Sequence, residues 1–313
     1  MKLAVLVGTC LVGVAADFGQ TTRYWDCCKP SCAWPGKTQL RRGPVQTCNS
    51  NNQQLNDNGN TQSGCNSGGS FMCSAQQPWA INNNLAYGFA AVHLQGQSEQ
   101  DWCCACYQLI LTSGSVQGKT MIVQATNTGG ELGNNHFDLQ IPGGGVGIFN
   151  GCQTQWGAPS DGWGQRYGGI NSQEQCSQLP WALQGGCNWR FNWFNNANNP
   201  SMSFQKVSCP KALTDISKCI RSDDNSSGSG GSWQNGANGA KWNMGCDFNE
   251  HNIGNQQSSG DQCSEVCRRR RNCNAFAWSN YNGGTCWMKS FSQVPTPVSS
   301  SGDSVCGYLP ERF

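Results

Sequence analysis

Short apolar segments alternate with glycine- and asparagine-rich stretches through the first two thirds of the chain. Residues 107–112 (YQLILT) and 119–126 (KTMIVQAT) have the composition of strands, and the glycines between them predict a turn. The apolar run 85–94 (LAYGFAAVHL) fits either a helix or a buried strand. Many short strands separated by glycine turns favour an all-β barrel over an α/β sheet.

Alternation of apolar and polar residues at 135–142 (NHFDLQIP) predicts a half-buried strand. His136, Asp138 and Gln140 share one face of this strand, and the apolar residues between them share the other. Since the apolar face packs on the core, we expect Asp138 in a cleft or in solvent. The glycine-rich run 143–149 lacks the dinucleotide and phosphate-loop spacings and indicates close backbone packing beneath a site.

A second carboxylate, Asp26, lies in the segment 21–34 (TTRYWDCCKPSCAW). If this segment is extended, Tyr24 and Asp26 point to the same side. The cysteines that follow would then hold the strand rigidly, as a catalytic group requires. The alternative is a disulfide knot in which Asp26 only caps a turn.

Composition divides the chain into four parts. Residues 1–16 have a positive start, a short apolar run and small residues at the end, which predicts a signal peptide and a secreted, extracellular protein. We expect a main domain at 17–221, a linker rich in glycine and serine at 222–240, and a small second domain at 241–313.

The cysteine count supports two closed units. The chain has 21 cysteines, of which 14 lie between positions 27 and 219 and six between 246 and 306. Even numbers in both parts predict two separate disulfide frameworks formed in an oxidising compartment.

Charge and composition narrow the class of ligand. Charged residues make up 12% of the chain and the net charge is +2, so we expect neither nucleic acid nor a membrane as a partner. The 13 tryptophans and the many Gly, Asn, Ser and Gln residues suit uncharged ligands rich in hydroxyl groups. The chain has 3 histidines and no repeated CxxC pairs, so we expect no metal and no cofactor.

A pair of aspartates among aromatic residues is the chemistry that remains. The chain has no Gly-x-Ser-x-Gly motif, which argues against a triad hydrolase. Glycosidic bonds are cleaved by two carboxyl groups, of which one protonates the leaving oxygen and the other activates water or attacks directly.

The segment 21–28 (TTRYWDCC) resembles the signature of the glycoside hydrolase family 45 endoglucanases. The resemblance continues through WCCACY, NHFDL, GGGVGIFNGC and QRYGGI, and it covers residues 20–219. It implies a six-stranded double-psi β-barrel with disulfide-tied loops and an open cleft. It also implies inverting hydrolysis of internal β-1,4-glucosidic bonds in cellulose or related β-glucans.

The main alternative is an expansin-like, non-catalytic protein that binds polysaccharide and loosens cell walls. Expansins resemble the same barrel and keep an aspartate like Asp138, but they lack a counterpart of Asp26. The intact motif around Asp26 therefore favours the enzyme.

Residue by residue, the resemblance implies that Asp26 is the general base and Asp138 the general acid. To stay protonated, Asp138 needs a raised pKa from an apolar or like-charged setting. Glu131 stands where the family often has an aspartate. The resemblance places substrate contacts at Thr22, Tyr24, Lys29, Trp34, Glu131 and His136.

The segments GCDF (245–248), CSEVC, CNAFAW and CWMK resemble a PAN/apple domain, a small α+β module, over residues 241–308. Such modules bind protein or carbohydrate, and we expect this one to target a carbohydrate surface. We expect the partner of the enzyme to be a β-1,4-glucan polysaccharide. We also expect the enzyme to be a monomer. The two resemblances also imply the disulfides Cys27–Cys152, Cys28–Cys65, Cys32–Cys103, Cys48–Cys73, Cys104–Cys219, Cys106–Cys209, Cys176–Cys187, Cys246–Cys306, Cys263–Cys286 and Cys267–Cys273.

Overall fold

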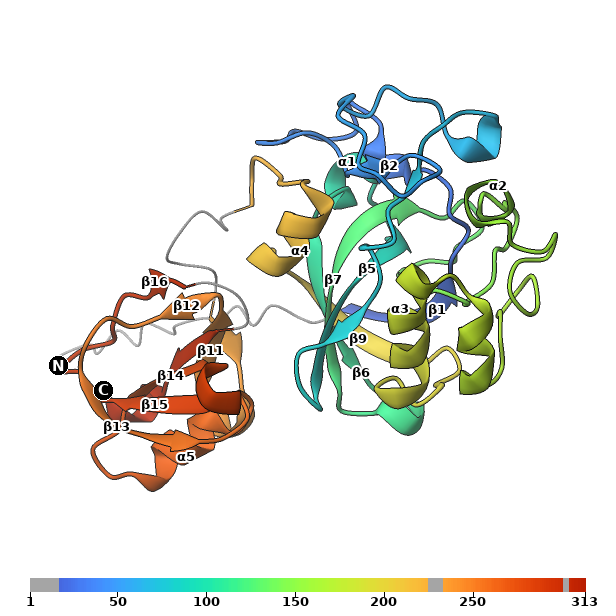
Figure 1. Cartoon of the computed structure of the whole chain (residues 1–313). Helices are drawn as coiled ribbons and strands as arrows, with labels where there is room; N and C mark the ends of the chain where they lie inside the picture. The colour runs from blue at the N-terminus through green and yellow to red at the C-terminus, as the bar shows by residue number, and fades with distance from the viewer. Residues whose placement is uncertain (1–16, 225–232, 301–303) are drawn as a thin grey trace, which may run out of the picture.

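Residues 17–224, 233–300 and 304–313 are described by a computed structural model, in which a larger N-terminal part lies beside a smaller C-terminal part (Figure 1). The predicted signal peptide, 1–16, and the middle of the predicted linker, 225–232, lie outside the described residues. Along the described residues, no helix has both the length and the apolar character needed to cross a membrane.

Six strands of the larger part form a closed β-barrel, because the sheet that begins with β5 returns to β5 through β8. The β5–β7 and β1–β8 pairs are parallel, and the other four pairs are antiparallel. The expected six-stranded barrel is thus confirmed. Around the barrel the order is β5 (Leu85–His93), β7 (Thr120–Thr128), β6 (Cys106–Leu111), β9 (Ser201–Val207), β1 (Asp17–Tyr24) and β8 (His136–Gln140), with β4 (Trp79–Ala80) added on the outer side of β5.

The barrel interior explains why the ambiguous run at 85–94 is a strand. Every residue of β5 except His93 is buried, because the strand pairs with β7 and β8 and carries apolar side chains on both faces. The rings of Tyr107, Phe137 and Phe204 meet edge to face in the interior. A strand that is buried on both faces carries apolar residues at successive positions, so it lacks the alternation of a half-buried strand.

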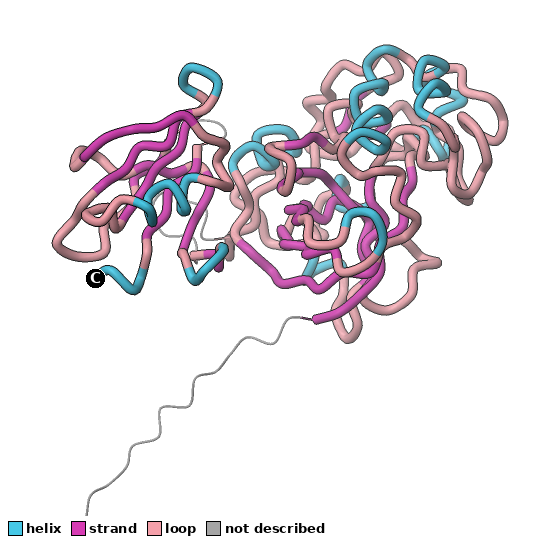
Figure 2. The backbone as a smooth tube through the Cα atoms, turned by 90° about the horizontal axis from the view of Figure 1, so that it is seen from below, coloured by secondary structure: helices cyan, strands magenta, loops and turns pink. Residues whose placement is uncertain are grey.

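Loops and short helices lie around the barrel (Figures 1 and 2). The α-helices are short except for α3, in which Trp189 stacks on Trp193 just after the helix ends. These elements are α1 (Glu99–Trp102), α2 (Cys152–Trp156), α3 (Trp181–Asn192), α4 (Lys211–Ser217), the 3₁₀ turns at Ser31–Ala33, Gly64–Asn66, Gly114–Val116 and Gln173–Gln178, and the paired strands β2 (Thr47–Cys48) and β3 (Phe71–Met72).

Disulfides tie these loops to the barrel, and all ten expected pairs are present. Three of them close loops of more than 100 residues, with separations of 125, 115 and 103. Long closed loops restrict the unfolded chain most, so these bridges stabilise segments that have little regular structure. Among the described cysteines, none pairs across the two parts of the chain.

The smaller part is an antiparallel six-stranded sheet that α5 (Cys263–Arg269) covers through contacts with β14 and β15. The α5 helix begins after a turn at 259–262, and its N-cap residue, Gln262, makes no side-chain cap. Its sheet runs β10 (Gln234–Asn235), β11 (Lys241–Met244), β17 (Val305–Tyr308), β14 (Ala275–Ser279), β15 (Thr285–Lys289) and β13 (Asn252–Gln257), and β12 (Cys246–Asp247) pairs with β16 (Val298–Ser299).

The two parts touch through apolar side chains. Trp242 and Met244 on β11 pack against a cluster of the larger part that includes Leu85, Tyr87 and Leu213. Beside this cluster, Gln108 Nε2 donates a buried hydrogen bond to Gln234 Oε1 (2.9 Å).

Candidate active site

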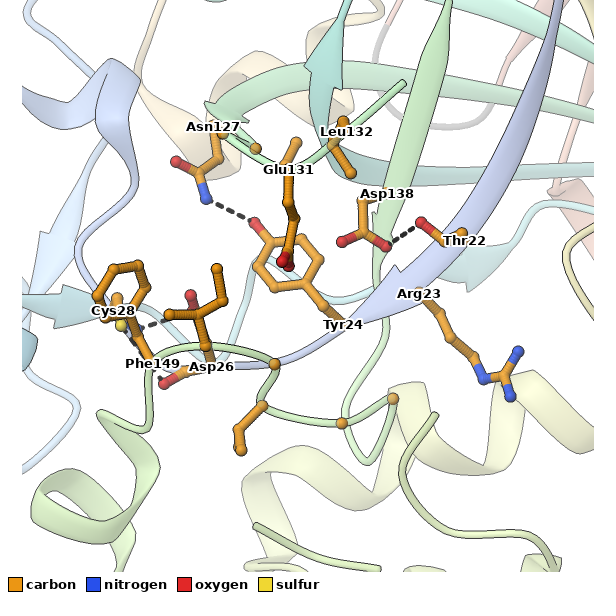
Figure 3. Close-up of a pocket in the computed structure, with 18 of the residues that line it drawn as sticks. Thr22, Arg23, Tyr24, Asp26, Cys28, Asn127, Glu131, Leu132, Asp138 and Phe149 are labelled. Carbon is orange, nitrogen blue, oxygen red and sulfur yellow. Dashed lines mark hydrogen bonds between the residues drawn. The ribbon is translucent and has the colours of Figure 1, made fainter. Parts of the chain in front are cut away.

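An open cleft of about 840 Å³ lies where β1 and β8 end. These strands are parallel neighbours, and Thr22 lies opposite Asp138 in their register. Parallel strands deliver their carboxyl ends to the same edge, so Asp138 and the segment after β1 line the same cleft. Figure 3 shows Tyr24 between Asp26 and Asp138 in this cleft, with Glu131 extending into the same space.

Asp26 lies just beyond β1, which ends two residues earlier than an extended segment through Asp26 requires. The backbone of Cys27 is left-handed (φ 62°) and turns the chain there, and disulfides fix both Cys27 and Cys28. Tyr24 and Asp26 nevertheless line the same cleft.

The surroundings of Asp26 favour a proton at unusually high pH. Its side chain is only 8% exposed, and this burial raises the pKa of the carboxyl from 3.8 to about 7. The Cys28 backbone N–H donates to Oδ1 (2.9 Å) and opposes the shift, while the charge of Asp138 adds to it. Asp26 therefore has one oxygen held by the backbone.

Asp138 is held by a chain of side chains from the two strands. The Thr22 hydroxyl donates to Asp138 Oδ1 (2.5 Å) and lies 2.8 Å from His136 Nε2. Burial raises the pKa of Asp138 to about 7, and the nearby charge of Glu131 contributes to the increase. Burial also lowers the pKa of His136, so its ring is neutral at neutral pH and donates one N–H to the Thr22 oxygen.

Tyr24 is oriented by two amides. Asn127 Nδ2 and Gln140 Nε2 each lie 3.0 Å from the Tyr24 hydroxyl oxygen. Asn127 Oδ1 accepts from the Ser31 backbone N–H (2.7 Å), so its Nδ2 must be the atom that donates to Tyr24. The two amides occupy both lone pairs of the phenol, which leaves the hydroxyl hydrogen available to donate to another group.

Lys29 and Trp34 form one unit at the cleft wall. The Lys29 ammonium donates to Gly59 O (2.6 Å) and Thr61 O (2.9 Å), and it lies 3.3 Å from the centroid of the Trp34 ring. Lys29 is 5% exposed, whereas the Trp34 ring is half-buried and lines the cleft. Lys29 therefore holds the Trp34 ring in place through contact with one face of the ring.

Several cleft residues were missed by the sequence interpretation. Ile148, Phe149 and Tyr167 line the cleft and are 54%, 56% and 63% exposed. Their signal was available, because large side chains beside several glycines, as in 143–149 and 167–169, are poorly placed for a close-packed core. Arg23 also lines the cleft and donates to Gly168 O (3.3 Å).

The floor of the cleft is bare backbone, as the glycine run predicts. Trp25 N–H donates to Gly145 O (2.7 Å), and a Cβ on Gly144 would lie 3.0 Å from the Tyr24 nitrogen. Arg190, 2% exposed, reaches the carbonyls of Gly143 and Gly168 from below. This buried cation holds the glycine loops together.

The arrangement provides two carboxyl groups of raised pKa, an oriented phenol donor and exposed aromatic surface in an open groove. Such a set can donate a proton to one oxygen and remove a proton from another. In the described part of the chain, no group of three or more His, Cys, Asp or Glu side chains is placed to hold a metal ion.

Comparison with known proteins agrees with this chemistry. An endoglucanase of Cryptopygus antarcticus is 57% identical over 224 residues, which cover 71% of this chain and 98% of that protein. An endoglucanase of Phaedon cochleariae is 47% identical, over 66% of this chain and 86% of that protein.

The crystal structure of the cellulase from the springtail Cryptopygus antarcticus superposes with a TM-score of 0.64 at 58% identity, over 67% of this chain and 99% of that one. Residues 245–289 match the PAN domain family. The family model of glycosyl hydrolase family 45 matches residues 18–220, and the chain belongs to this family.

Proposed function

We propose that the protein is an endo-β-1,4-glucanase that hydrolyses internal bonds of cellulose or a related β-glucan with inversion at the anomeric carbon. The observation that carries the proposal is the presence of Asp26 and Asp138 in one open cleft, each with a pKa raised to about 7. An open groove admits the middle of a polymer, whereas a closed pocket admits only its end.

Asp138 is the general acid. Its Oδ1 accepts from Thr22, so the proton resides on Oδ2 and is transferred from there to the glycosidic oxygen. Glu131 keeps that proton in place by repelling the charge that its loss would create.

Asp26 is the general base. Its ionised form is stabilised by the Cys28 backbone N–H, and the free oxygen removes a proton from the attacking water. With an inverting mechanism, the two carboxyl groups are expected roughly 6.5–9.5 Å apart, which leaves room for that water.

The remaining predicted contacts fit two tasks. Trp34, on the support of Lys29, offers an aromatic face to a sugar ring, and Tyr24 donates to a substrate oxygen. Thr22 and His136 orient the acid.

The C-terminal module is an accessory binding unit of this secreted, monomeric enzyme. It keeps the barrel near an insoluble glucan and so raises the local concentration of enzyme without altering the chemical step.

Release of reducing sugar from carboxymethylcellulose tests the proposal. Wild type should release sugar, and Asp26→Ala and Asp138→Ala should each lower the rate by at least about 10²-fold, the usual size of general acid–base catalysis. Proton NMR of cello-oligosaccharide hydrolysis should show the α-anomer first. Wild-type protein that binds the polymer but releases no sugar would favour the expansin-like alternative, and an initial β-anomer would overturn inversion.

A further inference from the structure

A second cavity, of about 380 Å³, lies on the C-terminal module between the chain after β12 and the chain after β15. Its lining contains no Lys, Arg, Asp or Glu. The lining residues are Phe248, Asn249, His251, Phe291, Ser292, Gln293, Val294, Pro295, Thr296 and Val298.

Buried polar side chains fix both walls of this cavity. The Lys289 ammonium, on a side chain that is 3% exposed, donates to Phe248 O (2.6 Å), Glu250 O (3.1 Å) and Asn252 Oδ1 (2.9 Å). On the other wall, Asn274 donates to Phe291 O (2.7 Å) and accepts from Phe291 N–H (2.9 Å). The cavity is therefore built by groups that do not enter it.

The first wall also has an unusual backbone. Glu250 and His251 are consecutive non-glycine residues in the left-handed region, with φ of 61° and 57°. Each such residue costs on the order of 1 kcal/mol or more, and strain of this kind persists where surrounding contacts impose it. The result is that the His251 ring lies 4.5 Å from the Phe291 ring at the cavity.

Polar groups at the cavity remain available to a ligand. Asn249, Ser292, Gln293 and Thr296 are exposed, and within the described residues their side chains have no hydrogen-bond partner. They offer amide and hydroxyl groups next to a fixed His–Phe pair.

We propose that this cavity is a binding site for a neutral glucan chain, distinct from the catalytic cleft. Aromatic rings present flat apolar faces that match the C–H faces of a pyranose, and neutral amides and hydroxyls match its hydroxyl groups. The lack of charge in the lining disfavours acidic glycans and phosphate. The proposal rests on the proposed function for its choice of glucan, since the same chain carries the cleft that acts on that polymer.

Titration of cellohexaose into full-length Asp26→Ala protein, with ¹⁵N-labelled histidine, tests the two sites separately. The signals of His251 are identified because they are missing from the spectrum of the His251→Gln variant. The signals of His136 report on binding in the cleft. We expect the His251 signals to shift and saturate. Gln293→Ala should weaken this binding by roughly threefold to tenfold, as expected for one or two lost neutral hydrogen bonds.

The matched control is Tyr281→Ala, which removes an aromatic side chain of the module that is 59% exposed and outside the cavity. It should leave the His251 titration unchanged. A His251 signal that stays fixed while His136 shifts would overturn this site and leave the proposed function intact. If neither histidine responds to cellohexaose, the cleft assignment fails as well.

Discussion

We propose that two buried carboxyl groups with similarly raised pKa values take different roles because of their immediate neighbours. Each carboxyl accepts one hydrogen bond that favours its charged form, Asp26 from the Cys28 N–H and Asp138 from Thr22. Asp138 also faces the negative charge of Glu131, which disfavours its charged form. The negative charges of Asp26 and Asp138 also repel each other, so the loss of a proton from one carboxyl group hinders its loss from the other. In the proposed mechanism the active enzyme carries one proton on the pair, so we expect activity to fall at pH values below and above the range in which that form dominates.

The fall of activity at alkaline pH tests the role of Glu131. Glu131→Gln removes a charge that raises the pKa of Asp138, so Asp138 loses its proton at lower pH and the alkaline limb of kcat should move to lower pH. Glu131→Asp keeps the charge and should leave the limb nearly in place. An unchanged limb in Glu131→Gln would assign Glu131 to substrate contact alone.

The raised pKa of Asp26 also affects stability. The folded state keeps the Asp26 proton up to about pH 7, while the unfolded chain loses it near 3.8, so the folded state is progressively disfavoured as pH rises between these values. The effect is on the order of 1.4 kcal/mol for each pKa unit.

Asp26→Asn keeps an oxygen for the Cys28 N–H and removes this penalty. Its melting temperature should exceed that of wild type at pH 8 and approach it at pH 4. Equal shifts at both pH values would contradict the raised pKa.

Asn127 is expected to act through Tyr24. Asn127→Ala frees the phenol to rotate, and we expect kcat to fall by roughly tenfold, about 1.4 kcal/mol. In a Tyr24→Phe background the same substitution should have no further effect, because contacting residues that act as a unit are not additive. Additive losses in the double variant would show that Asn127 acts independently of Tyr24.

At the scale of elements, the sequence predicted those strands whose pattern is local. The alternation at 136–140 predicted β8 and a position of Asp138 that faces the cleft. The apolar runs at 107–112 and 119–126 predicted β6 and β7. Capping signals were less reliable. The segment 259–262 (SGDQ) has the residue pattern of a capping box, but a tight turn occupies it and α5 begins at Cys263.

Contacts between distant segments could not be read from the sequence. Asn127 reaches Tyr24 across 103 positions, and Arg190 on α3 reaches the carbonyl of Gly143 across 47 positions. Burial of a cation or an amide depends on which carbonyls the fold brings near it. The disulfide pairs, of which three join cysteines more than 100 positions apart, were predicted by resemblance to known families and not by spacing.

Close packing of the glycine loops gives a prediction at this scale. Gly169 and Gly157 are both left-handed, with φ of 73° and 68°, but a Cβ on Gly169 would lie 1.8 Å from Gly143 O while one on Gly157 meets no atom within 4 Å. Gly157→Ala should cost roughly 1–2 kcal/mol from backbone strain alone.

Gly169→Ala should cost at least about 2 kcal/mol more, since a carbonyl of the cleft floor must move. Urea unfolding measures both variants, and activity should fall only in Gly169→Ala. Equal losses of stability in the two variants would show that the backbone beneath the cleft moves aside without added strain.

At the scale of the whole molecule, two units have separate disulfide frameworks but share an apolar contact. Composition predicts two units with a glycine- and serine-rich segment between them. It did not predict that Trp242 belongs to the core of the module and also packs against the barrel cluster with Leu85 and Leu213. A side chain shared by two cores couples their stability, although the cleft lies on the barrel alone.

Truncation after Ser229 separates these effects. All residues that line the cleft lie at or before position 199, so turnover of short soluble cello-oligosaccharides should be nearly unchanged. The melting temperature of the barrel should fall, because Leu85, Tyr87 and Leu213 lose the cover of Trp242 and Met244. In the full-length chain, Trp242→Ala should reproduce part of this fall and keep retention on swollen cellulose, whereas the truncated protein should lose retention. Loss of soluble turnover in a truncated protein that remains folded by circular dichroism would mean that the module completes the active site.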